Sequence, residues 1–317
     1  MLISLVIPVY NEGLGIKAFH NHLNKCLAKI NQTFEIIYVD DGSSDNSAQI
    51  ISKFADGNNI KLLQLSKNFG KELALTAGLF AATGQAIITI DSDNQHPPQL
   101  IEQFISKWQD GASVVVGVRR DDSKYSIRSW FGRMFYKTIN MFSKVNIVPG
   151  GSDYRLIDEQ VQAEFVKLSE NNRITRGLID WLGYDRQYIY FKSVERIAGK
   201  PNYSFVKLMA LAKDGLVSMT PFPLYFFGII GIIITPISFF LGIFILIEQI
   251  LLNDPMGLDF TGTAMLSILI VFLVGILLLG QGVFGLYLSN IQNQVMGRSL
   301  FVIDYKKSIG FGLEKKQ

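Results

Sequence analysis

The stretch Ile87–Pro98, IITIDSDNQHPP, joins an apolar run to a group of acidic and polar residues. The apolar run predicts a buried strand, and Asp91 and Asp93 follow its end. Because side chains two apart on an extended backbone point the same way, we expect both carboxylates to face one divalent cation. Such cations are commonly held by one or two carboxylates together with substrate phosphates. The alternative is a solvated acidic turn before a helix that starts near Pro97.

Strands and helices alternate on both sides of this stretch. We expect strands over Leu2–Val9, Phe34–Val39, Lys61–Leu65, Ile87–Ile90 and Ser113–Val118. Helices are expected over Ile16–Ile30, Ser47–Phe54, the residues up to Ala82, and Gln99–Trp108. This alternation predicts an α/β fold with a doubly wound, mostly parallel sheet, whose ligand crevice lies at the carboxyl ends of the strands.

The second half of the chain is far more apolar than the first. Of the 317 residues, 49% are hydrophobic and 18% are charged. Two runs, Leu224–Ile247 and Ala264–Leu288, contain no charged side chain, and each is long enough to cross ~30 Å of hydrocarbon as a helix. A buried hairpin in a soluble domain explains one such run better than two, so we expect two membrane spans. Met1–Pro8 has no basic region, and no secretion signal is expected.

Basic residues flank the two runs and are absent from the connection Leu251–Thr263. They are Lys200, Lys207 and Lys213 before the first run and Arg298, Lys306 and Lys307 after the second. The positive-inside rule therefore predicts an integral inner (plasma) membrane protein with both termini in the cytosol. The lone Cys26 fits a reducing compartment. A net charge of +3 without a basic stripe argues against a nucleic-acid partner.

A competing motif lies at Gly13–Ala18, GLGIKA, directly after the first predicted strand. It matches the G-x-G-x-x-A dinucleotide fingerprint, and Asp40 and Asp41 lie roughly where a ribose-binding acid is expected. Glu12 argues against this hypothesis, because its negative charge lies where a pyrophosphate should meet bare backbone amides.

Four motifs in order resemble glycosyltransferase family 2. They are IPVYNE at Ile7–Glu12, VDDGSSD at Val39–Asp45, NFGK at Asn68–Lys71 and DSDNQHPP at Asp91–Pro98. Within that family, the chain most resembles the polyisoprenyl-phosphate glycosyltransferases that are like dolichol-phosphate mannose synthase, of the bacterial GtrB type. The likeness continues through GGSDYRLID at Gly150–Asp158, RGLIDWLGY at Arg176–Tyr184 and GRSLFVI at Gly297–Ile303, and covers nearly the whole chain.

This resemblance implies a GT-A fold that transfers a sugar from a nucleotide sugar to the phosphate of a membrane polyprenol. It assigns nucleotide-sugar binding to Pro8, Tyr10, Glu12, Asp41, Lys71 and Asp91. It assigns Mg²⁺ or Mn²⁺ to Asp91, Asp93 and Gln95. It assigns binding of the acceptor phosphate or the donor diphosphate to Arg119, Arg133, Lys137 and Arg196, with Arg128 as an alternative to Arg133. Asp153 matches the acid proposed near the acceptor, which completes the expected catalytic group with Asp91 and Asp93.

A phosphate acceptor needs little acid or base chemistry. A phosphate monoester is already at least singly ionised near neutral pH, because its second pKa is about 6. We therefore expect Asp153 to position groups rather than to act as an indispensable base. In-line displacement inverts the anomeric centre, and glucose from UDP-glucose is the first donor suggested by the resemblance.

Four segments follow from these assignments. We expect a GT-A catalytic domain over 1–200, an interfacial amphipathic helix over 201–221, two transmembrane helices over 222–290 and a cytosolic tail over 291–317. Small residues such as Gly228 and Gly231 favour packing into a homo-oligomer within the membrane.

Two other functions fit part of the sequence. One is a processive polysaccharide synthase of the same superfamily, but the chain lacks a Q-x-x-R-W motif and has few spans for a polymer channel. The other is a non-catalytic, membrane-anchored nucleotide-binding protein. Such a protein should have lost part of its metal site, whereas Asp91 and Asp93 are both present.

Overall fold

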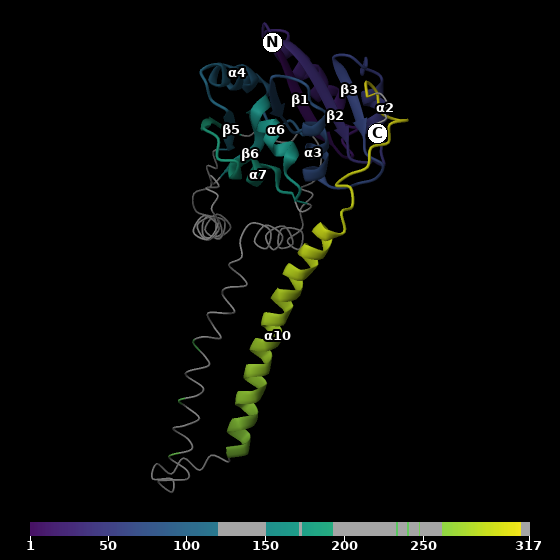
Figure 1. The fold of residues 1–317 in the computed structure, drawn as a ribbon. Coiled ribbons are helices and arrows are strands. Elements are labelled where there is room, and N and C mark those ends of the chain that lie inside the picture. The colour runs from purple at the N-terminus through teal and green to yellow at the C-terminus, as the bar shows by residue number, and fades with distance from the viewer. Residues whose placement is uncertain are drawn as a thin grey trace. The chain divides into compact units, whose positions relative to one another are not determined.

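The computed structural model describes residues 1–119, 150–170, 173–192 and 262–311, and the single residues 233, 240 and 247. The chain divides into two compact units, Met1–Ser204 with Arg298–Gln317, and Phe205–Gly297. The described part of the first unit is a layered α/β domain, and that of the second is dominated by the helix α10, Gly262–Val295 (Figure 1).

A seven-stranded sheet forms the centre of the first unit, in the order β3-β2-β1-β4-β6-β5-β7. The strands are β1 Leu2–Val9, β2 Thr33–Asp40, β3 Ile60–Gln64, β4 Ala86–Thr89, β5 Val114–Arg119, β6 Gly151–Asp158 and β7 Arg186–Phe191. All neighbours are parallel except β6, which is antiparallel to both β4 and β5. The predicted α/β fold with a mostly parallel sheet is therefore confirmed, and the sheet is mixed rather than purely parallel.

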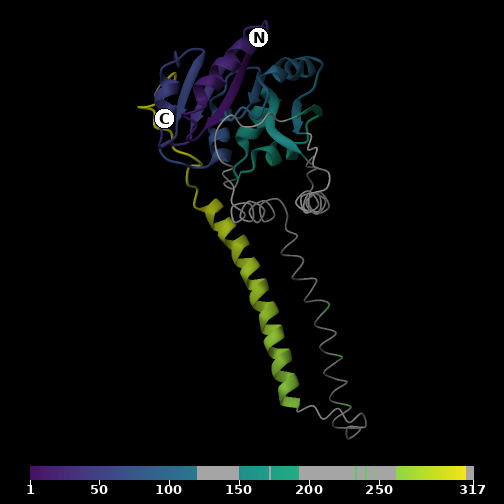
Figure 2. The same ribbon diagram turned by 180° about the vertical axis from the view of Figure 1, so that it is seen from behind.

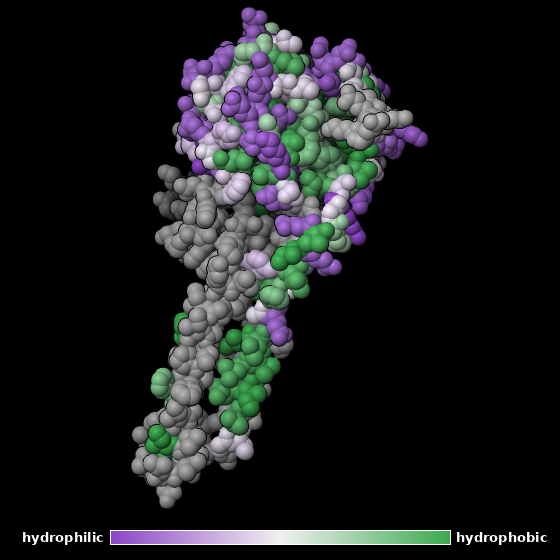
Figure 3. Space-filling view, in the orientation of Figure 1, coloured by the Kyte–Doolittle hydropathy of each residue, from purple (hydrophilic) through white to green (hydrophobic). Residues whose placement is uncertain are grey.

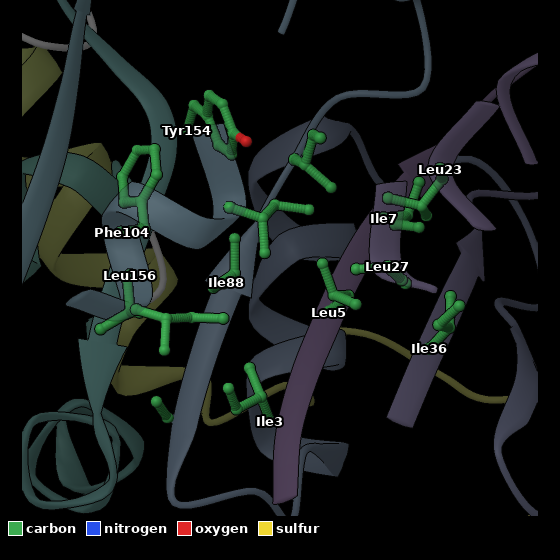
Figure 4. Packing of buried hydrophobic residues seen from close by; sticks show 14 of the residues in the cluster. Ile3, Leu5, Ile7, Leu23, Leu27, Ile36, Ile88, Phe104, Tyr154 and Leu156 are labelled. Carbon is green, nitrogen blue, oxygen red and sulfur yellow. The ribbon is translucent and has the colours of Figure 1, made fainter. Parts of the chain in front are cut away.

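Helices cover both faces of this sheet and bury two separate cores. One core packs against α1 Ile16–Leu27, α2 Ser47–Ser52 and α4 Ile101–Gln109, which follows the short 3-10 helix η1 Pro98–Leu100. The other packs against α3 Lys71–Ala81, α6 Glu159–Lys167 and α7 Thr175–Trp181. Alternation along β1 divides its side chains, since Ile3 and Leu5 enter the first core (Figure 4) and Val6 enters the second. Both faces of β1 are buried, which explains its continuous apolar run.

The last described segment of the chain covers the β3 edge of the sheet. Leu62 exchanges backbone hydrogen bonds of 3.0 and 2.8 Å with Ile309, and the Ser66 amide donates to the Val302 carbonyl at 2.8 Å. Phe301 packs against the second core and meets Phe80 edge to face. Figures 1 and 2 show this yellow segment beside β3. It therefore satisfies an edge that would otherwise present unpaired amides and carbonyls.

Helix α10 is 34 residues long and contains one of the two apolar runs, Ala264–Leu288. Large apolar side chains such as Leu277 and Phe284 are exposed on it, and Figure 3 shows the helix surface as mainly hydrophobic. Among the described residues, which leave out part of the α10 side chains, no helix is long and apolar enough to cross a membrane. The interfacial helix predicted at 201–221 lies outside the described residues.

A buried carboxylate ties the amino-terminal ends of the central strands together. Glu35 on β2 is 3% exposed. It accepts hydrogen bonds from Ser4 Oγ at 2.5 Å, Lys61 Nζ at 2.6 Å and the Thr83 amide at 3.1 Å. Burial alone would raise the pKa of Glu35, but the hydrogen bonds from Lys61, Ser4 and Thr83 outweigh burial and lower that pKa. Glu35 thus stabilises the fold as an anion.

Glu35→Gln should lower the free energy of unfolding at neutral pH by about 1–3 kcal/mol, because a charge-assisted buried network is broken. The folded pKa lies below the ordinary value of 4.5, so the contribution is complete above that value and is lost as pH falls through the folded pKa. Urea unfolding at neutral and acidic pH checks this, with the exposed Glu102→Gln as control. A deficit that is equally large in acid would contradict the assignment.

Candidate active site

The pairing of β4 with β6 brings two carboxylates to the same place. Thr89, the last residue of β4, lies opposite Arg155. Asp91 comes two residues after Thr89, and Asp153 comes two residues before Arg155 in an antiparallel partner. The Thr89 hydroxyl also donates to the Asp153 carbonyl, which holds the two chain segments together. The register therefore juxtaposes Asp91 and Asp153, although they are far apart in sequence.

Lys71 lies between these two carboxylates. Its Nζ is 2.7 Å from Asp91 Oδ1 and 2.9 Å from Asp153 Oδ2. Burial alone would lower the pKa of Lys71, but Asp91 and Asp153 raise it above its ordinary value. Burial alone would raise the pKa of Asp153, but Lys71 and the nearby Arg176 hold it well below its ordinary value. Both members of this pair are therefore charged at neutral pH.

The segment after β4 is a turn rather than a continued strand. β4 ends at Thr89, and Asn94 has a φ of 61°. Asp93 Oδ1 accepts from the Gln95 amide at 3.0 Å within this turn. The expectation that Asp91 and Asp93 lie on an extended backbone is therefore wrong, because a turn follows β4 and the period of two does not apply there.

His96 stabilises this turn through a hydrogen bond with its backbone. Its Nδ1 accepts from the Asp91 amide at 3.1 Å, which requires the tautomer protonated at Nε2. The ring is 4% exposed and stacks on Tyr154 with centroids 5.0 Å apart. Ser92 Oγ donates to the Pro8 carbonyl at 3.1 Å, which joins the turn to the end of β1. His96 and Ser92 are thus structural supports of the acidic turn.

Asp91, Asp93 and Gln95, the side chains expected to hold a divalent cation, all offer oxygen ligands, which Mg²⁺ and Mn²⁺ prefer. Asp91 is paired with Lys71, and Gln95 Oε1 accepts a hydrogen bond from Arg119 Nη2. In the part of the chain that the structure describes, no group of three or more His, Cys, Asp or Glu could hold a metal ion. The residues therefore fit a cation whose remaining ligands come from phosphate and water, and not one caged by the protein alone.

Asp41 holds the loop that leads into α3. Its carboxylate accepts from the Phe69 amide at 2.7 Å and from the Gly70 amide at 2.9 Å. Burial raises the pKa of Asp41, and these two amides oppose the increase. Gly42 has a φ of 64°, and a Cβ there would lie within 2.8 Å of the Lys67 backbone. The glycine of VDDG is therefore needed for the close approach of this loop.

The turn after β1 excludes the dinucleotide fingerprint. The Glu12 amide donates to Ser47 Oγ at 2.8 Å, and the Gly13 amide donates to Asp45 Oδ2 at 2.9 Å. A pyrophosphate at this turn would need those amides and would meet the Asp45 carboxylate. Asn11, with a φ of 55°, accepts from the Ser44 amide and completes the brace between the two turns.

The structure places most of the predicted site residues close to the carboxyl ends of the parallel strands, together with the start of β6. Tyr10 is 43% exposed at the end of β1, and Arg119 at the end of β5 contacts Gln95. The predicted positions Arg128, Arg133, Lys137 and Arg196 lie outside the described residues.

Two further residues near the site were not predicted. Glu72 Oε2 accepts from the Thr175 amide at 2.8 Å, which joins α3 to α7. Arg176 lies near enough to Asp153 to lower its pKa. Arg176 begins the RGLIDWLGY likeness and Glu72 directly follows the NFGK motif, but neither pattern shows these contacts, because the partners are distant in sequence.

The fold and the acidic turn define a GT-A-like α/β domain. The family model described as Glycosyl transferase family 2 matches residues 4–161. An uncharacterized glycosyltransferase from Synechocystis is 35% identical over 303 residues, covering 95% of this chain and 94% of that protein. The SfII prophage-derived bactoprenol glucosyl transferase of Shigella flexneri is 35% identical over 314 residues, covering 97% and 98%.

A solved structure, mannosyl-3-phosphoglycerate synthase from Rubrobacter xylanophilus, shares the fold. It has a TM-score of 0.51 and 15% identity, and the match covers 68% of this chain and 71% of that one. The chain therefore belongs to glycosyltransferase family 2, and it is an enzyme of sugar transfer.

His96→Phe should keep the stacking on Tyr154 and remove the acceptor for the Asp91 amide. An unpaired buried amide costs about 1–3 kcal/mol, so we expect kcat/KM for sugar transfer to fall roughly tenfold. His96→Asn, which retains a side-chain acceptor, should be less impaired. Steady-state kinetics of the two variants check this, and equal activity of His96→Phe and wild type would show that the bond does not position Asp91.

Proposed function

We propose that this enzyme transfers a single sugar from a nucleotide sugar to a polyprenyl phosphate at the cytosolic face of a membrane, with inversion at the anomeric carbon. UDP-glucose is the donor that we propose. The observation that carries the proposal is the convergence of Asp91, Lys71 and Asp153 in a family 2 chain that matches a bactoprenol glucosyl transferase over nearly its full length.

The charges of the site support a divalent cation as part of the donor complex. The acidic groups are Asp91, Asp93 and Asp153, and the basic groups are Lys71, Arg119 and Arg176. With Asp41 and Glu72 also close by, these described side chains offer no excess of positive charge, so they leave the charge of a nucleoside diphosphate uncompensated. Mg²⁺ or Mn²⁺ held by Asp91, Asp93 and Gln95 would supply that charge and stabilise the departing diphosphate.

The state of Asp153 supports an acceptor that is already ionised. A hydroxyl acceptor needs a general base whose pKa lies near the working pH. Lys71 and Arg176 hold the pKa of Asp153 well below its ordinary value, which makes it a weak base. A phosphate oxygen attacks without such help, since its second pKa is about 6.

Asp153 has a positioning role in this proposal. Its Oδ1 is buried and accepts no hydrogen bond from any described residue. A buried carboxylate oxygen without a donor is costly, so a substrate hydroxyl is a fitting partner for it. Asp153 would then orient the substrate through Oδ1 while Lys71 holds Oδ2.

The apolar runs support the membrane part of the proposal. A polyprenyl phosphate presents its reacting group at the lipid surface, and an enzyme anchored beside it gains from proximity. Leu224–Ile247 and Ala264–Leu288 would be the anchors, with both termini cytosolic and with copies packed into a homo-oligomer.

Asp91→Asn should reduce transfer by about a hundredfold or more, since it removes charge from the group that holds the donor diphosphate. Chelation of divalent cations should reduce wild-type transfer similarly, and added Mg²⁺ or Mn²⁺ should restore it. Radiolabelled sugar in the lipid extract of membranes provides the measurement, and the exposed Asp110→Asn is the charge-matched control. Full activity of Asp91→Asn, or of the chelated enzyme, would refute the metal role.

A second prediction concerns the two substrates. With labelled UDP-glucose, the purified enzyme should glycosylate polyprenyl phosphate and leave the matching free polyprenol unmodified, because a hydroxyl needs a base that Asp153 does not provide. Parallel reactions with other labelled nucleotide sugars test the donor. Efficient glycosylation of the free alcohol would overturn the acceptor assignment, and a better rate with another nucleotide sugar would overturn the donor assignment alone.

A further inference from the structure

The contact of Lys71 with Asp91 resembles the way a carboxylate holds a metal ion. Lys71 Nζ lies 2.7 Å from Asp91 Oδ1 and 2.8 Å from Asp91 Oδ2, so both oxygens face one positive charge. Asp153 Oδ2 adds a third oxygen at 2.9 Å. The ammonium is thus enclosed by oxygens of two carboxylates, and it occupies the Asp91 oxygens that a divalent cation held by Asp91, Asp93 and Gln95 would need.

The backbone at Lys71 is fixed on both sides. The preceding Gly70 donates its amide to Asp41 at 2.9 Å, and the following Glu72 accepts the Thr175 amide at 2.8 Å. Asp41 holds the loop that ends at Lys71, so Lys71 joins this loop to the Asp91–Asp153 pair.

We propose that Lys71 is a tethered cation that occupies the Asp91–Asp153 carboxylate pair in the absence of donor and thereby makes divalent-metal binding depend on the nucleoside diphosphate. This inference rests on the proposed function, since it presumes a metal–diphosphate donor. An ammonium and a divalent ion repel each other at such a short separation, so the metal binds poorly to the empty site. The added negative charge of a diphosphate attracts both cations and removes this conflict.

Thermodynamic linkage gives the proposal a measurable form. If the diphosphate tightens metal binding, then the metal must tighten diphosphate binding by the same factor. Lys71 is therefore a positioning residue whose removal should weaken this coupling, and not only lower turnover. Lys71→Met removes the charge and keeps a long apolar side chain, whereas Lys71→Arg keeps the charge.

The experiment measures Mn²⁺ binding to the purified full chain in detergent, with electron paramagnetic resonance of free Mn²⁺ as readout and with protein-free Mn²⁺–UDP solutions as the reference for chelation by UDP itself. For the wild type, UDP should tighten Mn²⁺ binding by about tenfold or more. Lys71→Met should bind Mn²⁺ about tenfold more tightly than wild type without UDP, and the further tightening by UDP should be correspondingly smaller. Lys71→Arg should keep the weak Mn²⁺ binding without UDP, and the exposed Lys53→Met is the control expected to match wild type in both conditions.

Three outcomes would overturn the inference. Lys71→Met could bind Mn²⁺ without UDP no more tightly than wild type. The wild type could bind Mn²⁺ equally well with and without UDP, which is a result that needs no variant and stands even if Lys71→Met does not fold. Finally, Mn²⁺ could bind in no condition, which would also refute the metal in the proposed function. In the first two cases, metal-dependent transfer by the wild type would leave the proposed function intact.

Discussion

The antiparallel pairing of β4 with β6 is the constraint on which the site depends. It brings Asp91, just after the carboxyl end of β4, next to Asp153, near the start of β6. Two partly buried carboxylates there would repel each other without a cation between them. Lys71 supplies that charge, and it can do so only because Asp41 and Glu72 fix the start of α3. One strand pairing thus requires a particular helix start, a particular loop and a particular lysine.

The sequence predicts the first five strands well and the last two poorly, for a physical reason. β1 to β5 are runs of buried apolar residues, whose signal is local. β6 carries a charged residue into the interior, where Arg155 donates to Asp180 at 2.7 Å with both side chains almost fully buried. β7 is an edge strand that is half exposed, so its apolar pattern is weak. Only tertiary contacts make these segments strands.

The same distinction applies to the candidate site. Residues that follow parallel strands, such as Asp41 and Asp91, were expected at a common edge, and the structure places them there. Asp153 reaches the edge at the start of an antiparallel strand, which the rule for parallel sheets does not cover. The extended backbone expected between Asp91 and Asp93 is absent, because β4 ends at Thr89 and a turn follows. Motif likeness identified these residues, whereas their partners required the fold.

The loop that Asp41 holds shows how far the site extends from its motifs. Its first residue, Ser66, donates its amide to the Val302 carbonyl, while Gly70 at its other end is held by Asp41. A segment near the end of the chain therefore fixes one end of a loop whose other end leads into Lys71. Truncating the chain before Val302 would leave the Ser66 amide and the β3 edge unpaired, which would destabilise the start of the loop that leads into Lys71. The carboxy-terminal segment therefore stabilises the loop that leads into Lys71, and the sequence of the loop alone does not predict this contact.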